Sequence, residues 1–277
     1  MTDPDRPIQP PSHGPLRRPD RLYPGYLFDL DGTVYLGDDV LPGAAEALTA
    51  LRAAGSRLVF LSNKPLERPT AYAAKLRTMG VPTGDEDVVS SIDALVGYLR
   101  EHPPERAILA VTEPLLEEIL REAGWTVSRE PADVDLVVVS WDRTFDYDKL
   151  ERAFRAVRAG ARIVATNPDP FCPTPDGGLP DCAAMLAAIE VSTGAKAEAI
   201  VGKPSAHMAR VALERLGLPA GEVVMVGDRL LTDIAMAHAN GMLGALVLTG
   251  ATRLDDLPPA PAGPDFVLEG LGQLVPA

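Results

Sequence analysis

The stretch that decides the fold is Tyr26-Leu27-Phe28-Asp29-Leu30-Asp31-Gly32-Thr33-Val34-Tyr35. Its first residues form a short apolar run that predicts a buried strand over 26–30. Asp29 and Asp31 are two positions apart, so they share one face if the strand continues that far. A carboxylate at the end of a buried strand is costly unless a neighbouring group compensates its charge. An aspartate before glycine is also common in turns, so Asp31 taken alone fits an ordinary turn as well.

Outward from this stretch, strand-like and helix-like segments alternate along the chain. The expected strands are continuous apolar runs, which is typical of parallel strands covered on both faces. Strands are expected over 57–61, 107–111, 136–139, 162–165, 199–201, 222–226, 243–248 and 266–268. Helices are expected over 43–54, 67–79, 114–122, 146–158, 182–191, 205–216 and 230–239. This alternation predicts an α/β fold with a doubly wound parallel sheet.

Ligands bind such sheets at the carboxyl ends of the strands, so the polar residues there are candidates for a site. Besides the first strand end, the candidates are Ser62-Asn63-Lys64, Gly202-Lys203-Pro204, and Gly227-Asp228 with Asp233. Each has an ordinary alternative: Ser62 and Asp228 fit helix caps, and Lys203 fits a solvated surface residue. Their occurrence together at several segment ends favours one shared site.

These residue types suit phosphoryl transfer. One carboxylate can attack phosphorus and form an acyl phosphate, and a second can protonate the leaving group and then activate water. Asp29, Asp228 and a backbone carbonyl could hold Mg²⁺, a hard cation that prefers oxygen ligands. Ser62, backbone N–H groups at a helix start and Lys203 could neutralise the phosphate oxygens. Asp233 could then hold Lys203 or a water molecule in place.

The composition excludes several classes of protein. The net charge of −13 argues against nucleic-acid binding, which needs a basic face. No stretch approaches 18 uninterrupted apolar residues, which argues against a membrane span. The start of the chain shows no apolar segment of a signal peptide, so we expect a cytoplasmic protein. The sequence contains no P-loop, no dinucleotide fingerprint after a strand and no zinc-type cysteine motif.

The motifs beginning at Asp29, Ser62, Gly202 and Gly227 together resemble the four motifs of the haloacid dehalogenase (HAD) superfamily of phosphatases. Leu41-Pro42-Gly43-Ala44 and Ala165-Thr166-Asn167-Pro168-Asp169 resemble its subfamily IIA. That subfamily includes NagD-like nucleotide and sugar phosphatases, 4-nitrophenylphosphatases, phosphoglycolate phosphatase and pyridoxal phosphatase. The resemblance spans about residues 25–250.

The resemblance implies an Mg²⁺-dependent phosphatase that hydrolyses a small phosphomonoester through an aspartyl phosphate. Asp29 would be the nucleophile, and Asp31 the general acid and then base. The metal would be held by Asp29, Asp228 and the backbone carbonyl of Asp31. The phosphate would be bound by Ser62, Asn63 and Lys203, with Thr33 and Asp233 in support. Two alternatives are a haloacid-type hydrolase, whose members lack the second aspartate, and a non-catalytic phosphometabolite-binding protein.

The family carries an α/β cap between its second and third motifs. Lys203 follows Asn63 by 140 positions, and the residues between them have their own alternation of strands and helices. We therefore expect a core domain over 23–87 and 195–277, a C2-type cap over 88–194 and a disordered, proline-rich arm over 1–22. Such a cap would exclude water and select the leaving group, and a homodimer could form through it.

Cap residues near the substrate are assigned from the resemblance: Trp141, Phe171, Cys172, Pro173 and Asp181. The aromatic and cysteine residues also fit plain packing, and Asp181 also fits a helix N-cap. The chain departs from the family pattern at Asp181 and at Lys64, where relatives often have small residues. Lys64 either adds positive charge to the pocket or points to solvent. Sugar phosphates, phosphoglycolate, nucleotides and pyridoxal phosphate all remain open as substrates.

Overall fold

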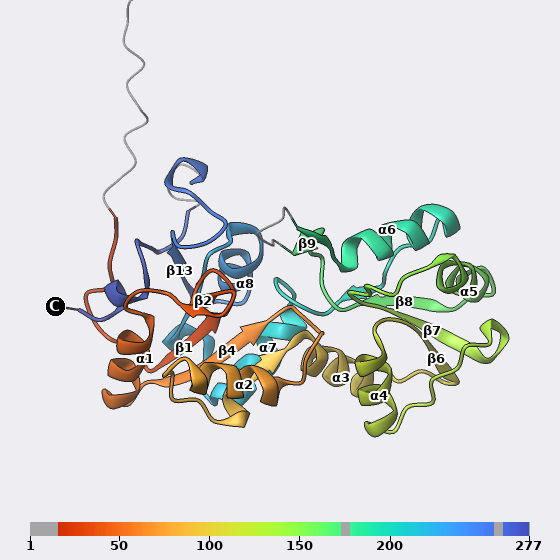
Figure 1. The fold of residues 1–277 in the computed structure, drawn as a ribbon, viewed down its shortest axis with the longest axis horizontal. Coiled ribbons are helices and arrows are strands. Elements are labelled where there is room, and N and C mark those ends of the chain that lie inside the picture. Colours follow the sequence, from red (N-terminus) through yellow and green to blue (C-terminus); the bar gives the residue numbers. More distant parts are fainter. Residues whose placement is uncertain (1–15, 173–177, 258–262, 277) are drawn as a thin grey trace, which may run out of the picture.

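The computed structural model describes residues 16–172, 178–257 and 263–276 of the chain. Two parallel sheets lie side by side along the long axis of the molecule (Figure 1). The larger sheet has six strands in the order β14–β13–β12–β1–β4–β5, which places β1 between β12 and β4. Its strands are β1 (Gly25–Asp29), β4 (Arg57–Ser62), β5 (Val88–Ser90), β12 (Val223–Gly227), β13 (Leu243–Val247) and β14 (Phe266–Leu268).

Helices cover both faces of the large sheet. Tyr26 and Phe28 of β1 are buried with helices on one face, and Leu27 is buried with helices on the other. This follows from the alternation of side chains along a strand, and it explains why the strand is apolar throughout. The predicted doubly wound α/β class is therefore confirmed. The helices are α1 (Ala44–Ala53) and α2 (Pro69–Thr78) on the first face, and α3 (Ser91–Glu101), α7 (Ala206–Leu216) and α8 (Ala235–Ala239) on the second.

The smaller sheet has four parallel strands in the order β11–β8–β7–β6. Apolar side chains of α4 pack on one of its faces, and those of α5 and α6 pack on the other. We call this sheet and its three helices the cap. Its elements are β6 (Ala107–Val111), α4 (Pro114–Glu122), β7 (Val134–Val139), α5 (Tyr147–Arg158), β8 (Arg162–Ala165), α6 (Cys182–Thr193) and β11 (Ala199–Ile200).

Two short antiparallel hairpins complete the described structure. The first joins β2 (Tyr35–Leu36) to β3 (Asp39–Val40) just after β1, and the second pairs β9 (Phe171–Cys172) with β10 (Leu179–Pro180) in the cap. Single 3₁₀ turns lie at Asp85–Asp87, Pro131–Asp133, Ala220–Glu222, Leu254–Asp256 and Leu271–Leu274. In the part of the chain that the structure describes, no helix is both long and apolar enough to span a membrane.

The boundaries of the cap differ from those expected at 88 and 194. Strand β5 pairs with β4 in the large sheet, and α3 packs against α7 on the same face of that sheet. Strand β11 pairs with β8, so it belongs to the smaller sheet. The chain therefore leaves the large sheet after α3 and returns after β11. The helix over α3 was not predicted, although Ser90 and Asp93 form a capping box at its start.

The expected N-terminal arm over 1–22 is described only from residue 16 onward. The Val267 N–H of the edge strand β14 donates a hydrogen bond to the Arg17 carbonyl over 3.0 Å. The Arg17 guanidinium donates to the Pro264 carbonyl over 2.5 Å. The end of the predicted arm is thus held along the edge of the large sheet, because an edge strand has backbone groups to pair.

Candidate active site

The site lies where the carboxyl ends of three neighbouring strands meet. Asp29 ends β1, Ser62 ends β4, and Asp228 directly follows β12. All three residues line one cavity of about 270 Å³. Cap residues of hairpin β9–β10 line the same cavity, so it lies between the large sheet and the cap. This is the edge at which the sequence predicts a site.

Lys203 is the central cation of the site. It is 3% exposed, and its Nζ lies 2.7 Å from Asp233 Oδ1 and also pairs with Asp29 Oδ1. Burial lowers the pKa of Lys203, but the charges of Asp233 and Asp29 outweigh it and raise the pKa overall. The solvated surface alternative is therefore wrong, because this ammonium is buried between two carboxylates.

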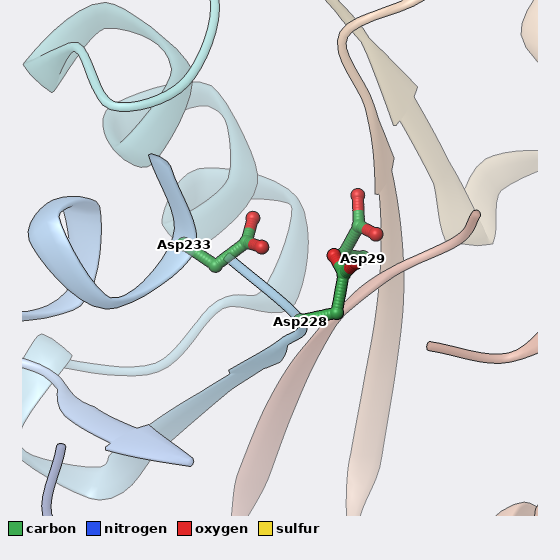
Figure 2. Close-up of side chains that lie close together, drawn as sticks. All are labelled: Asp29, Asp228 and Asp233. Atoms are coloured by element: carbon green, nitrogen blue, oxygen red, sulfur yellow. The ribbon is translucent and has the colours of Figure 1, made fainter. Parts of the chain in front are cut away.

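Asp29, Asp228 and Asp233 form an acidic cluster in which one oxygen from each lies within 4.8 Å of the others. Figure 2 shows the three carboxylates gathered at the ends of β1 and β12 and at the turn that follows. Burial, followed by the charges of Asp29 and Asp233, raises the pKa of Asp228 to about 7. Burial and nearby negative charges destabilise the ionised form of a carboxyl group unless a cation lies close to it.

The cluster fits a hard divalent cation. Asp228 Oδ2 accepts a hydrogen bond from the Ala251 N–H over 2.6 Å. Asp228 Oδ1 is buried and has no hydrogen-bond partner among the described residues. Gly32 and Gly250 pack so closely on this carboxylate that a Cβ at either position would overlap it. A buried, unpaired oxygen beside two further carboxylates is the donor set that Mg²⁺ prefers.

The third carboxylate of this cluster belongs to Asp233. The third metal ligand expected from the sequence, beside Asp29 and Asp228, is instead Asp31. A single helix is predicted over 230–239, but the structure has a π-helical turn at Leu230–Ile234 before α8. Such wide turns are frequent at functional sites. Here the turn places the Asp233 carboxylate against Lys203 and within 3.1 Å of the Arg229 N–H. The proposed contribution of Asp31 is its backbone carbonyl, which stays a prediction.

The Asp31 side chain lines the cavity and pairs with a different cation. Its Oδ2 lies 2.9 Å from Lys64 Nζ. Gly32, with φ of +84°, allows the sharp turn in which the Gly32 N–H donates to the Tyr35 carbonyl. Thr33 is buried, and its hydroxyl lies 3.4 Å from Asp29 Oδ2. The turn therefore carries Asp31 into the cavity. Lys64 lines the same cavity, so the alternative in which it merely points to solvent is wrong.

Ser62 and Asn63 both line the cavity, but their side chains also hold the loops around them. Ser62 Oγ accepts from the Lys64 N–H over 3.1 Å. Asn63 Oδ1 accepts from the Lys203 N–H over 2.8 Å, and Asn63 Nδ2 donates to Asp169 Oδ2 over 2.9 Å. Asn63 thus fixes the loop that carries Lys203. Direct phosphate contacts of Ser62 and Asn63 stay predictions.

The structure separates the five candidate residues of the cap. Phe171, Cys172 and Asp181 line the cavity. Asp181 also accepts a hydrogen bond from the Cys182 N–H at the start of α6, so it is a helix cap as well as a cavity residue. Trp141 is 3% exposed, lies just beyond the end of β7 and is not among the described residues that line the cavity, so its contact with substrate stays a prediction. Pro173 lies outside the described residues.

Asp169 and Arg229 line the cavity but are not among the predicted site residues. Asp169 follows β8 in the cap, and its carboxylate lies 2.9 Å from Asn63 Nδ2 and 3.7 Å from an Arg229 guanidinium nitrogen. Both residues could be found by examining the residues that follow every strand. Arg229 is next to Asp228, and Asp169 is the last residue of the motif that begins at Ala165. The same rule would find Thr249, whose hydroxyl donates to the Gly32 carbonyl over 2.6 Å.

Comparisons with known proteins agree with this geometry. Residues 26–126 match the haloacid dehalogenase-like hydrolase family, and residues 200–274 match a HAD-hydrolase-like family. The chain is 40% identical to sugar-phosphatase AraL of Bacillus subtilis, over 89% of this chain and 90% of AraL. The structure is similar to 4-nitrophenylphosphatase from Thermotoga maritima, with a TM-score of 0.86, 37% identity and 92% and 97% of the two chains covered. NagD from Escherichia coli gives a TM-score of 0.84 at 32% identity, covering 93% of this chain and 100% of NagD.

Proposed function

We propose that this chain, which belongs to subfamily IIA of the haloacid dehalogenase-like hydrolases and is a phosphomonoesterase, acts through a phosphoaspartate on Asp29. One observation carries this proposal: Asp29, Lys203 and the Asp228 carboxylate meet in one cavity at the strand ends. A nucleophile, a fixed cation and an acidic cation site are the groups that phosphoryl transfer needs.

In the first step, a carboxylate oxygen of Asp29 attacks phosphorus and the ester oxygen leaves. Lys203 holds the Asp29 carboxylate in place, and its positive charge would balance the phosphate oxygens. Asp31, on the next turn of the chain, would give its proton to the leaving oxygen. In the second step Asp31 would take a proton from water as that water attacks the phosphoaspartate. Inorganic phosphate is then released and Asp29 is restored.

Mg²⁺ is the cation that we propose for the acidic cluster. Asp29 and Asp228 would bind it with the backbone carbonyl of Asp31, and Asp233 would stay bound to Lys203. The cation would neutralise charge on the transferring phosphoryl group. The unpaired Oδ1 of Asp228 supports this assignment, because a bound cation would satisfy it.

The substrate is proposed to be a small phosphorylated metabolite. The cap side of the cavity combines an aromatic ring, Phe171, with a carboxylate, Asp181, which suits an organic group that carries hydroxyls. AraL is named a sugar phosphatase, so sugar phosphates are the first compounds to test. A cytoplasmic location and a homodimer through the cap stay predictions.

The test is a phosphate-release assay of the purified protein with Mg²⁺. The panel contains sugar phosphates, phosphoglycolate, nucleotides, pyridoxal phosphate and 4-nitrophenyl phosphate. We expect turnover of several members, its loss in Asp29→Asn, and unchanged turnover in Lys196→Met, whose ammonium is on the exposed cap surface. A phosphoaspartate should be trapped on Asp29 by rapid quenching and mass spectrometry. Absence of turnover across the panel, or a phosphoryl group on another residue, would contradict the proposal.

A further inference from the structure

Lys64 occupies the boundary between the two halves of the cavity. Its ammonium lies 2.9 Å from Asp31 Oδ2 on the large-sheet side and hydrogen-bonds the side chain of Cys172 on the cap side. The side chain is 29% exposed and lines the cavity. Lys203, the other lysine of the cavity, lies deeper and is 3% exposed. The two ammonium groups therefore lie at different depths of the cavity.

Lys64 has more N–H donors than its partners among the described residues use. An ammonium has three N–H donors. Among the described residues, its side-chain partners are Asp31 and Cys172, which accept one N–H each, and the third can reach a ligand in the cavity.

The ester oxygen of a phosphomonoester occupies a defined place in such a cavity. In the proposed reaction it joins the phosphate, which would lie by Asp29 and Lys203, to the organic group, which would lie under the cap hairpin. It must also approach Asp31, if Asp31 is to give it a proton. The atom that satisfies these conditions lies beside the Asp31 carboxylate and between the two sides, which is where the Lys64 ammonium is held.

We propose that Lys64 is a catalytic residue that hydrogen-bonds the leaving oxygen. This inference rests on the proposed function. As the bond between phosphorus and an Asp29 oxygen forms, the bond between phosphorus and the ester oxygen breaks, and its electron pair stays on the ester oxygen. That oxygen takes the proton of Asp31. Lys64 donates an N–H hydrogen bond to the oxygen as its charge develops, and Lys64 keeps its own proton.

The dependence of rate on the leaving group tests this role. Nitrophenolate spreads its charge over the nitro group and needs little help, whereas an alkoxide needs much. The measurement is kcat/KM for 4-nitrophenyl phosphate, phenyl phosphate and glycerol phosphate, because kcat/KM reports the transfer to Asp29 and not the later hydrolysis. The variants are Lys64→Met, Lys64→Gln and Lys64→Arg, with Lys196→Met as the matched exposed-lysine control. Thermal unfolding checks that each variant is folded.

In Lys64→Met we expect kcat/KM to fall by about 100-fold for glycerol phosphate. The fall should be intermediate for phenyl phosphate and several-fold at most for 4-nitrophenyl phosphate. Lys64→Gln should behave similarly, and Lys64→Arg should keep much of the wild-type pattern. An equal fall for all three esters would mean that Lys64 acts on a part that all three share, such as the phosphate, and would overturn the proposal, as would an unchanged variant. Wild-type protein without activity on any ester would overturn the proposed function and this inference together.

Discussion

The two sides of the cavity are built in different ways. On the large-sheet side, Asp29, Lys203 and Asp233 are joined in one ion-pair network, and Asp233 is fully buried. On the cap side, Phe171 lies on a hairpin whose strands have two residues each, and it is 49% exposed. Fixed charges at strand ends suit a reaction that is the same for every substrate. Exposed residues on a short hairpin suit contacts that change with the substrate.

This comparison is tested most strongly at Asp29, the proposed nucleophile. Asp29→Asn should lower kcat by about 1000-fold or more, because an amide is a poor nucleophile at phosphorus. The fold should persist, since Lys203 keeps Asp233 as its partner at 2.7 Å. Steady-state kinetics and a thermal melt of the same sample measure both effects. A folded variant that keeps more than about a hundredth of the activity would show that Asp29 is not the nucleophile.

Removal of the proposed metal should have the next largest effect. Exhaustive chelation should lower activity by about 100-fold, and Mg²⁺ should restore it while Ca²⁺ inhibits, because Ca²⁺ prefers more and longer contacts. Mg²⁺ should also raise the Tm of the wild-type protein but not that of Asp228→Asn. Full activity in the chelated protein, or an equal Tm shift in both proteins, would remove the metal from this cluster.

Asp181, on the cap side, should affect how the stability of the protein depends on pH. Burial raises its pKa from 3.8 to about 6, against the lowering effect of the Cys182 N–H. The unfolded chain therefore loses this proton at lower pH than the folded chain, so the folded protein loses stability as pH rises from about 4 to about 6. Between these limits the free energy of unfolding should fall by roughly 2 kcal/mol relative to Asp181→Asn, which still caps α6.

Denaturant melts of both proteins at several pH values measure that difference. A constant difference between wild type and Asp181→Asn across this range would show that Asp181 titrates normally in the folded protein.

The smallest expected effect is on the cap side. Phe171→Ala and Cys172→His should change the ratios of kcat/KM among phosphoesters by about 10-fold, the amount typical of one pocket contact. Trp141→Ala is the contrast. Because Trp141 is buried and is not among the described residues that line the cavity, its loss should lower stability by roughly 3 kcal/mol and leave the ranking of substrates unchanged. A uniform loss in the Phe171 and Cys172 variants would place specificity elsewhere.

The large-sheet side was predictable because its signals are local. Asp29 directly ends an apolar run, and parallel strands must bring their carboxyl ends together, so Asp228 lies beside it although it is almost 200 positions away. The order of the strands is not needed for that inference. Even here the sequence pattern missed the π-helical turn, because Leu230–Ile234 and α8 have only five residues each, too few for apolar spacing to distinguish them from one helix.

The cap side was less predictable because its contacts are not periodic. Trp141 and Phe171 both follow or form strand ends, yet one is buried and the other lines the cavity. That difference depends on how the hairpin β9–β10 is packed, which apolar spacing does not encode. The same reason accounts for α3: its capping box was visible, but its place on the large sheet follows from its packing against α7.

Gly202 connects the loop that carries Lys203 to the cap, and this contact matters for recombination between related genes. Its N–H donates to the Thr166 carbonyl of the cap over 2.8 Å, and a Cβ at this position would overlap that carbonyl. The neighbouring Lys203 is therefore aligned by a backbone contact with the cap. A chimaera that receives a foreign cap must also inherit a matching path for the chain at Thr166. Otherwise the exchange alters the position of Lys203, the proposed phosphate-binding lysine, and a swap intended to change selectivity would damage turnover instead.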